Sequence, residues 1–145
     1  MQLTEHFTLE EMTFSEIALR SGLDNTPDQS TIANLTRLAQ LLEKVRSLIG
    51  KPIRVNSGYR SLNVNKLVGG QANSQHCLGC AADIRIDGMT PDEIIKLIMN
   101  SNIQYDQIIR EFDSWVHISI PNGVGYVPRH NAYIIDKNGT RPYLA

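Results

Sequence analysis

Apolar residues recur between positions 29 and 50 at the spacing of one helix face. Gly50 follows this stripe and predicts the end of the helix. Thr26-Pro27-Asp28-Gln29 comes before it and indicates a helix start, with Thr26 as the cap and proline at the first helical position. The pattern predicts a long amphipathic helix whose apolar face belongs to the core. The stripe consists of Ile32, Leu35, Leu38, Leu41, Leu42, Val45, Leu48 and Ile49.

Three shorter segments carry helix signals as well. Thr8-Leu9-Glu10-Glu11 has the pattern of a capping box and predicts a short helical turn. Residues 14–20 continue helically until Gly22. Thr90-Pro91-Asp92-Glu93 repeats the capping pattern and predicts a helix that runs to Asn100.

The remaining apolar runs are short and predict strands. A tight turn at Asp113-Ser114 separates two of them, and an Asn138-Gly139 turn predicts a final hairpin. Because helices come first and most strands come later, the order predicts an α+β fold with an antiparallel sheet. The expected strands are residues 53–57, 82–86, 107–112, 115–120, 132–136 and 140–144.

Length and charge narrow the class of protein. The 145 residues suit one domain, residues 1–145, that we expect to be monomeric. The net charge of −1 creates no field that favours nucleic acid or an anionic membrane. The first residues lack the basic and apolar regions of a signal peptide, and no apolar run approaches the ~20 residues that span a bilayer. We therefore expect a chain made in the cytoplasm, which needs help to reach any substrate beyond the membrane.

Two histidines and a carboxylate supply the candidate chemistry. His76 comes before a glycine-containing turn, and Asp83 follows seven residues later in a predicted strand, so both side chains can return to one point. His117 stands in the later segment Trp115-Val116-His117. Three such ligands hold a catalytic zinc ion and leave its fourth position open.

Cys77 and Cys80 form a C-x-x-C pair beside His76 and allow three interpretations. Thiolates bind zinc well, so the pair could join His76 as ligands. A redox pair is the second interpretation, although no thioredoxin-like βαβ pattern surrounds it. The third is that both are small buried residues near a turn, which we favour.

Several motifs together resemble a known family. They are Ser57-Gly58-Tyr59-Arg60-Ser61, Asn65, Val68-Gly69-Gly70, the pattern S-x-H-x-x-G-x-A-x-D from Ser74 to Asp83, and Trp115-Val116-His117. The chain is similar to the zinc D-Ala-D-Ala peptidases, which include dipeptidases of vancomycin resistance, phage endolysins and the metal site of Hedgehog signalling domains. The likeness is nearest to the short phage branch and covers nearly the whole chain. It implies the Hedgehog/DD-peptidase-like fold, with N-terminal helices packed on a central, mostly antiparallel sheet.

The resemblance also implies roles for individual residues. It places one zinc ion on His76, Asp83 and His117, and it directs Arg60 at the scissile carbonyl, where a cation stabilises the tetrahedral oxyanion. Arg60 could instead pair with a surface carboxylate. Ser74 could bind substrate or only cap the turn that holds His76, and Gln75 is a similar case.

The general base departs from the family pattern. Many relatives place Glu, Asp or His two or three residues before the last ligand, where this chain has Ser114 and Trp115. The nearest carboxylates are Glu111 and Asp113, which on a continuous strand would share a face with His117.

The turn between the two strands decides between these carboxylates. A three-residue loop of Asp113-Ser114-Trp115 would pair Glu111 with His117. A two-residue loop would pair Arg110 with His117 and turn Glu111 to the other face. The phage branch carries a glutamate at the end of the first strand, so we expect Glu111 to be the base and Asp113 to be second.

The expected function is that of a zinc peptidase which hydrolyses peptide bonds involving D-amino acids in peptidoglycan peptides, in a phage or prophage setting. The altered base position keeps an alternative open, a non-catalytic zinc-binding domain of the same fold that binds a peptide or protein partner. A thiol redox protein using Cys77 and Cys80 is a weaker third option.

Overall fold

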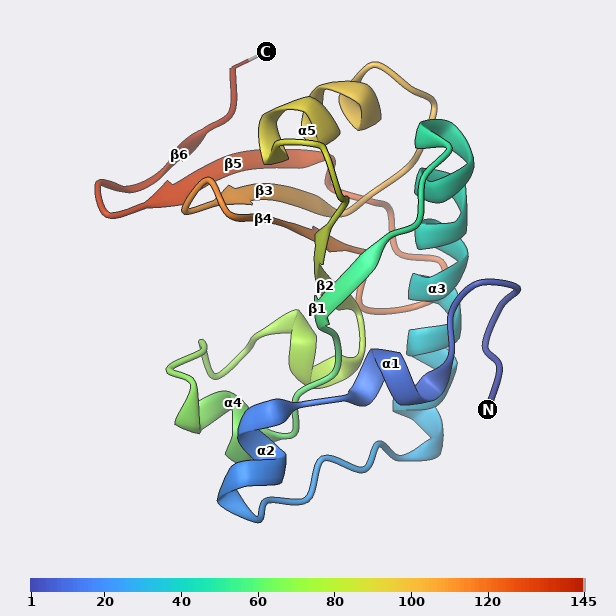
Figure 1. Cartoon of the computed structure of the whole chain (residues 1–145), viewed down its shortest axis with the longest axis vertical. Coiled ribbons are helices and arrows are strands. Elements are labelled where there is room, and N and C mark those ends of the chain that lie inside the picture. The colour runs from blue at the N-terminus through green and yellow to red at the C-terminus, as the bar shows by residue number, and fades with distance from the viewer. Residues whose placement is uncertain (145) are drawn as a thin grey trace.

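A six-stranded sheet with the order β1-β2-β4-β3-β5-β6 forms the centre of the fold in the computed structural model, which describes residues 1–144 (Figure 1). The pairing of β3 with β5 is parallel, and the other neighbouring strands are antiparallel. The predicted α+β fold with a mostly antiparallel sheet is confirmed. The strands are β1 (Arg54–Ser57), β2 (Ala81–Arg85), β3 (Gln107–Glu111), β4 (Trp115–Ser119), β5 (Asn131–Asp136) and β6 (Gly139–Pro142).

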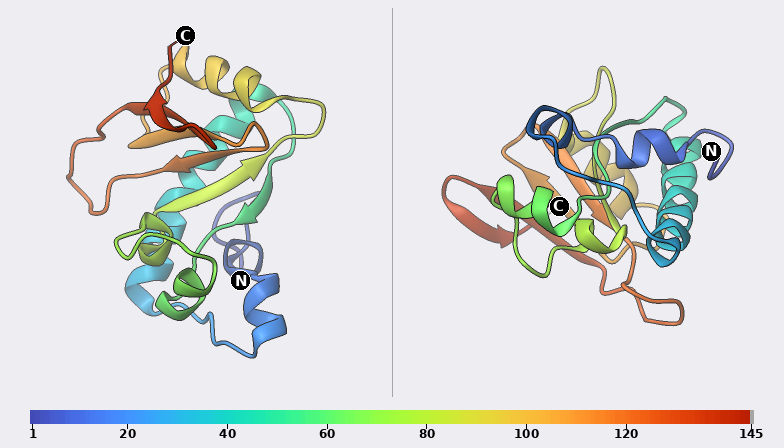
Figure 2. Two further views of the ribbon diagram at one scale, coloured as in Figure 1. Left: turned by 90° about the vertical axis from the view of Figure 1, so that its left-hand side faces the viewer. Right: turned by 90° about the horizontal axis from the view of Figure 1, so that it is seen from below.

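Helices surround this sheet unevenly. The long α3 passes behind the strands in the left view of Figure 2, and the segment with α4 and η1 lies nearer the viewer at the lower end. Figure 1 shows α5 at the opposite end, above β3 and β5. The helices are α1 (Leu9–Thr13), α2 (Glu16–Ser21), α3 (Gln29–Ile49), α4 (Leu62–Leu67) and α5 (Pro91–Met99), with the 3₁₀ turn η1 (Gln75–Leu78).

One face of the sheet packs into the hydrophobic core, and the other carries polar side chains of the candidate site. Because side chains alternate along a strand, Ile84 of β2, Ile118 of β4 and Ile108 of β3 enter the core with α5 and with most of the apolar stripe of α3. Two residues of the predicted stripe lie outside this core, because Leu48 is exposed and Ile32 is only partly buried. Their neighbours Asp83 and His117 belong to the other face and pair directly in the β2–β4 register. The hydrophobic core therefore fixes the strands that carry these two polar side chains.

The structure corrects several predicted boundaries. The cap of α3 is Asp28, whose Oδ1 accepts the Thr31 N–H at 2.8 Å, and Thr26 lies outside the helix. In the last hairpin Asp136 already pairs with Gly139, so the tip is Lys137-Asn138. The short elements α4 and η1 were not predicted. Among residues 1–144, no helix is both long enough and apolar enough to cross a bilayer.

Candidate metal centre

His76 is held in η1 with one ring nitrogen directed at the cluster. The Ser74 hydroxyl accepts the His76 backbone N–H at 3.2 Å and caps this turn. Nδ1 of His76 lies 2.7 Å from the Gly58 carbonyl, which only accepts, so Nδ1 carries the proton. Nε2 is buried and meets no hydrogen-bond partner among the described residues. Burial lowers the pKa of His76, which keeps the imidazole in the neutral form that ligates metals.

Asp83 lies between the two histidines. Its Oδ1 is 3.4 Å from Nε2 of His76 and 3.2 Å from Nδ1 of His117. Burial opposes ionisation of Asp83, but the two imidazoles outweigh it and hold the pKa of this carboxyl well below its usual range. Asp83 is therefore an ionised acceptor at neutral pH.

The three side chains have the spacing of a metal site. Their ligating atoms all lie within 4.8 Å of one another. Zinc bonds of about 2.0–2.1 Å in tetrahedral geometry place ligand atoms about 3.3–3.4 Å apart, close to the two distances at Asp83. The unpartnered Nε2 of His76 is explained by the same arrangement. Residues His76, Asp83 and His117 can thus hold a metal ion.

The cysteines lie outside this cluster. Neither Cys77 nor Cys80 belongs to the metal-binding group found among residues 1–144, and both are free thiols. Cys80 is part of the hydrophobic core. Burial raises the pKa of both thiols, which opposes the thiolate form needed for metal binding or exchange. The geometry supports the interpretation of small residues near a turn.

The hairpin before His117 differs from both predicted loops. Phe112 and Asp113 have positive φ values of 52° and 51°, which makes Phe112-Asp113-Ser114 the turn. Ile109 then pairs with His117, and Glu111 pairs with Trp115. Both predicted pairings of His117 were wrong, because the turn begins one residue earlier than expected. Glu111 nevertheless keeps the face of His117, since it follows Ile109 by two residues.

Glu111 reaches the cluster from this position, whereas Asp113 does not. Glu111 Oε1 lies 3.8 Å from His117 Nδ1, and Oε2 accepts a 3.1 Å hydrogen bond from Trp115 Nε1. Burial, together with the Asp83 charge, raises the pKa of Glu111 above its ordinary value. Asp113 is exposed and borders a separate hollow beside β2 and α5.

Arg60 lines the same cleft as Glu111 and the three-residue cluster. Its backbone N–H donates to the His76 carbonyl at 3.1 Å, which ties the Arg60 loop to η1. Among the described residues no carboxylate forms an ion pair with Arg60, and its Nε is buried without a partner. The alternative of a surface ion pair is therefore not observed.

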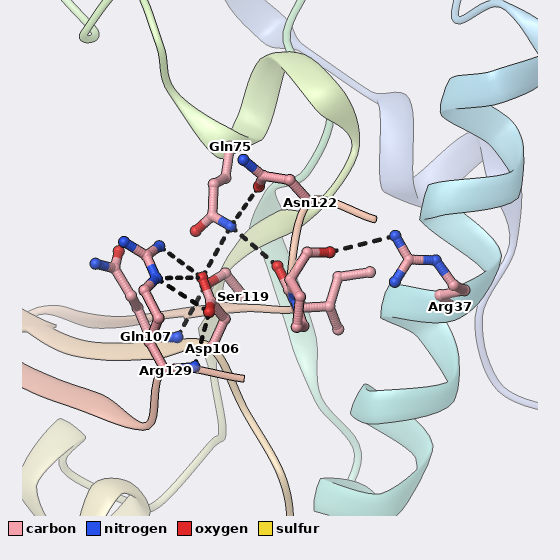
Figure 3. A network of polar contacts seen from close by, with 9 residues as sticks. Arg37, Gln75, Asp106, Gln107, Ser119, Asn122 and Arg129 are labelled. Atoms are coloured by element: carbon pink, nitrogen blue, oxygen red, sulfur yellow. Dashed lines mark hydrogen bonds and ion pairs between the residues drawn. The ribbon is translucent and has the colours of Figure 1, made fainter. Parts of the chain in front are cut away.

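A cleft of about 720 Å³ contains the cluster. The predicted substrate residues Ser74 and Gln75 line it, although each also has a structural contact. Ser74 caps η1, and Gln75 Nε2 donates to Asp106, to the Ile120 carbonyl and to Asn122 (Figure 3). The other lining residues are Arg60, Val68, Gly69, Gly70, Gln71, Asn73, His76, Asp83, Gln107, Ile109, Glu111, Phe112, Trp115, His117, Arg129 and Ile135.

Sequence reasoning missed two residues of the site. The Gly58 carbonyl fixes the His76 ring, and a side chain at position 58 would collide with the Met12 backbone carbonyl. That close approach explains the glycine in Ser57-Gly58-Tyr59, which was the available signal. The second is Arg129, which no motif singled out. Trp115 also lines the cleft.

Comparisons with known proteins agree with this geometry. The family model described as Peptidase M15 matches residues 5–119. A stretch of 44 residues is 50% identical to the zinc D-Ala-D-Ala carboxypeptidase of Streptomyces albus G. This match covers 30% of the chain and 17% of that relative's length. Because the family model covers most of its length, the chain belongs to the peptidase M15 family.

Proposed function

We propose that the protein is a zinc peptidase that hydrolyses peptide bonds involving D-amino acids in peptidoglycan peptides. One observation carries the proposal: the three ligating atoms converge beside the Glu111 carboxylate, and Arg60, which forms no ion pair within residues 1–144, lines the same cleft. The family and the name of the Streptomyces relative support the metal and the class of substrate.

His76 Nε2, Asp83 Oδ1 and His117 Nδ1 would hold one zinc ion. When bound, zinc supplies a Lewis acid that polarises a carbonyl and lowers the pKa of a coordinated water to about 7. The Gly58 carbonyl keeps His76 in the required tautomer, as outer partners of ligating histidines commonly do.

Glu111 serves as the general base in this proposal. Its Oε1 lies beside the cluster, where it can accept a proton from the attacking water. The raised pKa of Glu111 is closer to neutral pH than that of an ordinary glutamate, which suits a general base. The Trp115 indole holds the second oxygen, so the carboxylate does not turn away. The proton is then available at Glu111 for the leaving amine.

Arg60 stabilises the oxyanion that forms as water adds to the carbonyl. Its guanidinium lines the same cleft and is not neutralised by an ion pair within residues 1–144. A cation placed where charge develops stabilises the transition state more than the ground state. Ser74 and Gln75 line the same cleft and are the candidates for polar contacts to the peptide.

The non-catalytic zinc-binding domain is the second candidate. Glu111 beside the cluster favours the enzyme, because a binding domain has no need of a half-buried carboxylate next to the metal. The single-domain organisation, the monomeric state and the phage or prophage setting stay predictions.

Fragment analysis tests the proposed function. Purified peptidoglycan is incubated with the zinc-loaded protein, and the released peptides are identified by mass spectrometry with and without a chelator. The proposal expects fragments that end or begin at a D-amino acid and that disappear with the chelator. Inertness toward every D-amino-acid peptide, with zinc bound, would favour the binding domain.

A further inference from the structure

Arg129, which lines the cleft, forms an ion pair with Asp106 (Figure 3). Asp106 is only 3% exposed and accepts hydrogen bonds from the Arg129 backbone N–H at 3.0 Å and from its Nη2 at 2.6 Å. Nε of Arg129 lies 3.1 Å from both carboxylate oxygens, and Gln75 Nε2 adds a fourth donor at 3.1 Å. The guanidinium is therefore held in one orientation before any ligand arrives.

The pair leaves one edge of Arg129 open to the cleft. Within the described chain Nη1 donates no hydrogen bond, and the Arg129 side chain is 52% exposed. Asp106 lies beneath it with a side chain that is 4% exposed. Because the negative partner is buried and the positive one is at the surface, the pair turns its positive end toward the cleft.

The register of the sheet places this cation relative to the cluster. Ile109 pairs with His117, and Asp106 precedes Ile109 by three residues, which corresponds to about 10 Å along the strand. Glu111 lies on the other side of Ile109. An extended peptide advances about 3.3–3.6 Å per residue, so Arg129 stands within about three residues of a bond held at the cluster.

The part of the cleft around Arg129 has the charge needed to bind an anion. The carboxylates that line the cleft are Asp83 and Glu111, and both lie at the cluster. Gln75 and Gln107 are the polar neighbours at the Arg129 end. Arg129 also follows the segment 5–119 that matches the family model, so this cation comes from a part of the chain outside that match.

We propose that Arg129 determines specificity by binding a carboxylate of the peptide substrate, within about three residues of the cleaved bond. The carboxylate is either the C-terminus of the peptide or an acidic side chain. Arginine suits this task because its planar donors match a carboxylate, and Asp106 and Gln75 position it. This inference rests on the proposed peptidase function.

Matched peptides test the inference. The parent is an acetylated tetrapeptide, Glu-Lys-D-Ala-D-Ala, and its two analogues carry a C-terminal amide or Gln in place of Glu. We expect Arg129→Gln to lower kcat/KM for the parent about 10- to 100-fold, mainly through KM. The loss should be under about threefold for whichever analogue lacks the carboxylate that Arg129 binds. A small loss with the amide would assign this carboxylate to the C-terminus, and a small loss with the Gln analogue would assign it to the Glu side chain.

Arg141→Gln is the matched control. Arg141 pairs with Asp136 on the β5–β6 hairpin in the same two-donor manner, but it does not line the cleft. This variant should hydrolyse all three peptides like the wild type. Equal losses for Arg129→Gln on all three peptides, or no loss on any, would overturn the inference and leave Arg129 as a partner for Asp106 alone.

A binding measurement separates this inference from the proposed function. Fluorescently labelled forms of the three peptides are titrated with zinc-loaded Glu111→Gln and with Glu111→Gln/Arg129→Gln, so that hydrolysis does not compete with binding. The protein that keeps Arg129 should prefer the parent over one analogue by about tenfold, and the protein that lacks it should show no preference. If the Arg129→Gln protein unfolds, adding Asp106→Asn removes both charges together and should show the same loss. Equal affinity of the Arg129-containing protein for all three peptides contradicts the inference, whatever the catalytic result.

Discussion

Trp115 and Glu111 face each other in the last pair of the β3–β4 ladder, and the indole Nε1 donates a 3.1 Å hydrogen bond to Glu111 Oε2. The other carboxylate oxygen lies 3.8 Å from Nδ1 of His117. Because the indole restrains one oxygen, the second stays directed at the candidate metal centre. The hairpin turn therefore sets the position of the proposed base.

Replacing Glu111 by Gln keeps the size of the side chain and removes the proton acceptor. We expect kcat to fall about 10²- to 10⁴-fold, the usual contribution of a general base. Zinc content should stay at the wild-type level, because Glu111 is not among the three ligands. Steady-state kinetics and metal analysis of the same preparation measure both effects.

Asp113→Asn is the control for this substitution. Asp113 lies in the turn, two residues after Glu111, and borders a different hollow, so its variant should keep full activity. A large loss in Asp113→Asn with an unaffected Glu111→Gln would transfer the role of base to Asp113.

Trp115→Phe should reduce kcat about tenfold with little change in KM. The substitution keeps an aromatic wall but removes the N–H donor, and a hydrogen bond to a charged group contributes about 1.5 kcal/mol or more. The double variant Trp115→Phe/Glu111→Gln should be no slower than Glu111→Gln, because the indole acts through the carboxylate. Additive losses would mean that Trp115 contacts substrate independently.

Zinc binding should depend on the histidines and not on the thiols. His76→Ala removes one of three ligands, and we expect most of the zinc to be lost on dialysis. Cys77→Ser/Cys80→Ser should retain it, since neither thiol belongs to the cluster. Atomic absorption on both variants checks the prediction, and zinc loss confined to the cysteine variant would replace the proposed ligand set.

The Asp106 pair should stabilise the fold in a pH-dependent manner. Burial opposes ionisation of Asp106, but Arg129 outweighs it and holds the pKa of this carboxyl below its ordinary value. The stabilisation is therefore complete above the unfolded-state pKa near 4 and is lost as the pH falls through the lower folded-state pKa. Denaturant unfolding should show Asp106→Asn less stable by about 1–3 kcal/mol at pH 7, with a smaller difference near pH 3. A difference that does not change with pH would contradict this account.

The helical half of the fold was predictable because its signals are local. The capping boxes at Thr8 and Thr90 and the αL glycine Gly50 appear in the structure as expected. Asp28 replaced Thr26 as the α3 cap because its carboxylate reaches the Thr31 N–H. The parallel β3–β5 pair depends on contacts between distant segments, which no local pattern encodes.

The candidate site likewise has residues that the sequence predicted and residues that it did not. His76, Asp83 and His117 stand in motifs specific enough to propose as ligands, and the structure brings them together. The hairpin register was not predictable, since it depends on positive φ values at Phe112 and Asp113, which non-glycine residues rarely adopt. Arg129 was missed because its position in the cleft depends on a buried partner in a distant segment.

Titration of metal-free protein with zinc tests the central claim most directly. The rate of hydrolysis of a peptide ending in D-Ala-D-Ala is measured at increasing ratios of Zn²⁺ to protein. We predict that the rate rises linearly from near zero and reaches a plateau at about one zinc per chain, as a single three-ligand site requires. A rate that stays at the level of Glu111→Gln at every ratio, or one that is already maximal without metal, would contradict it.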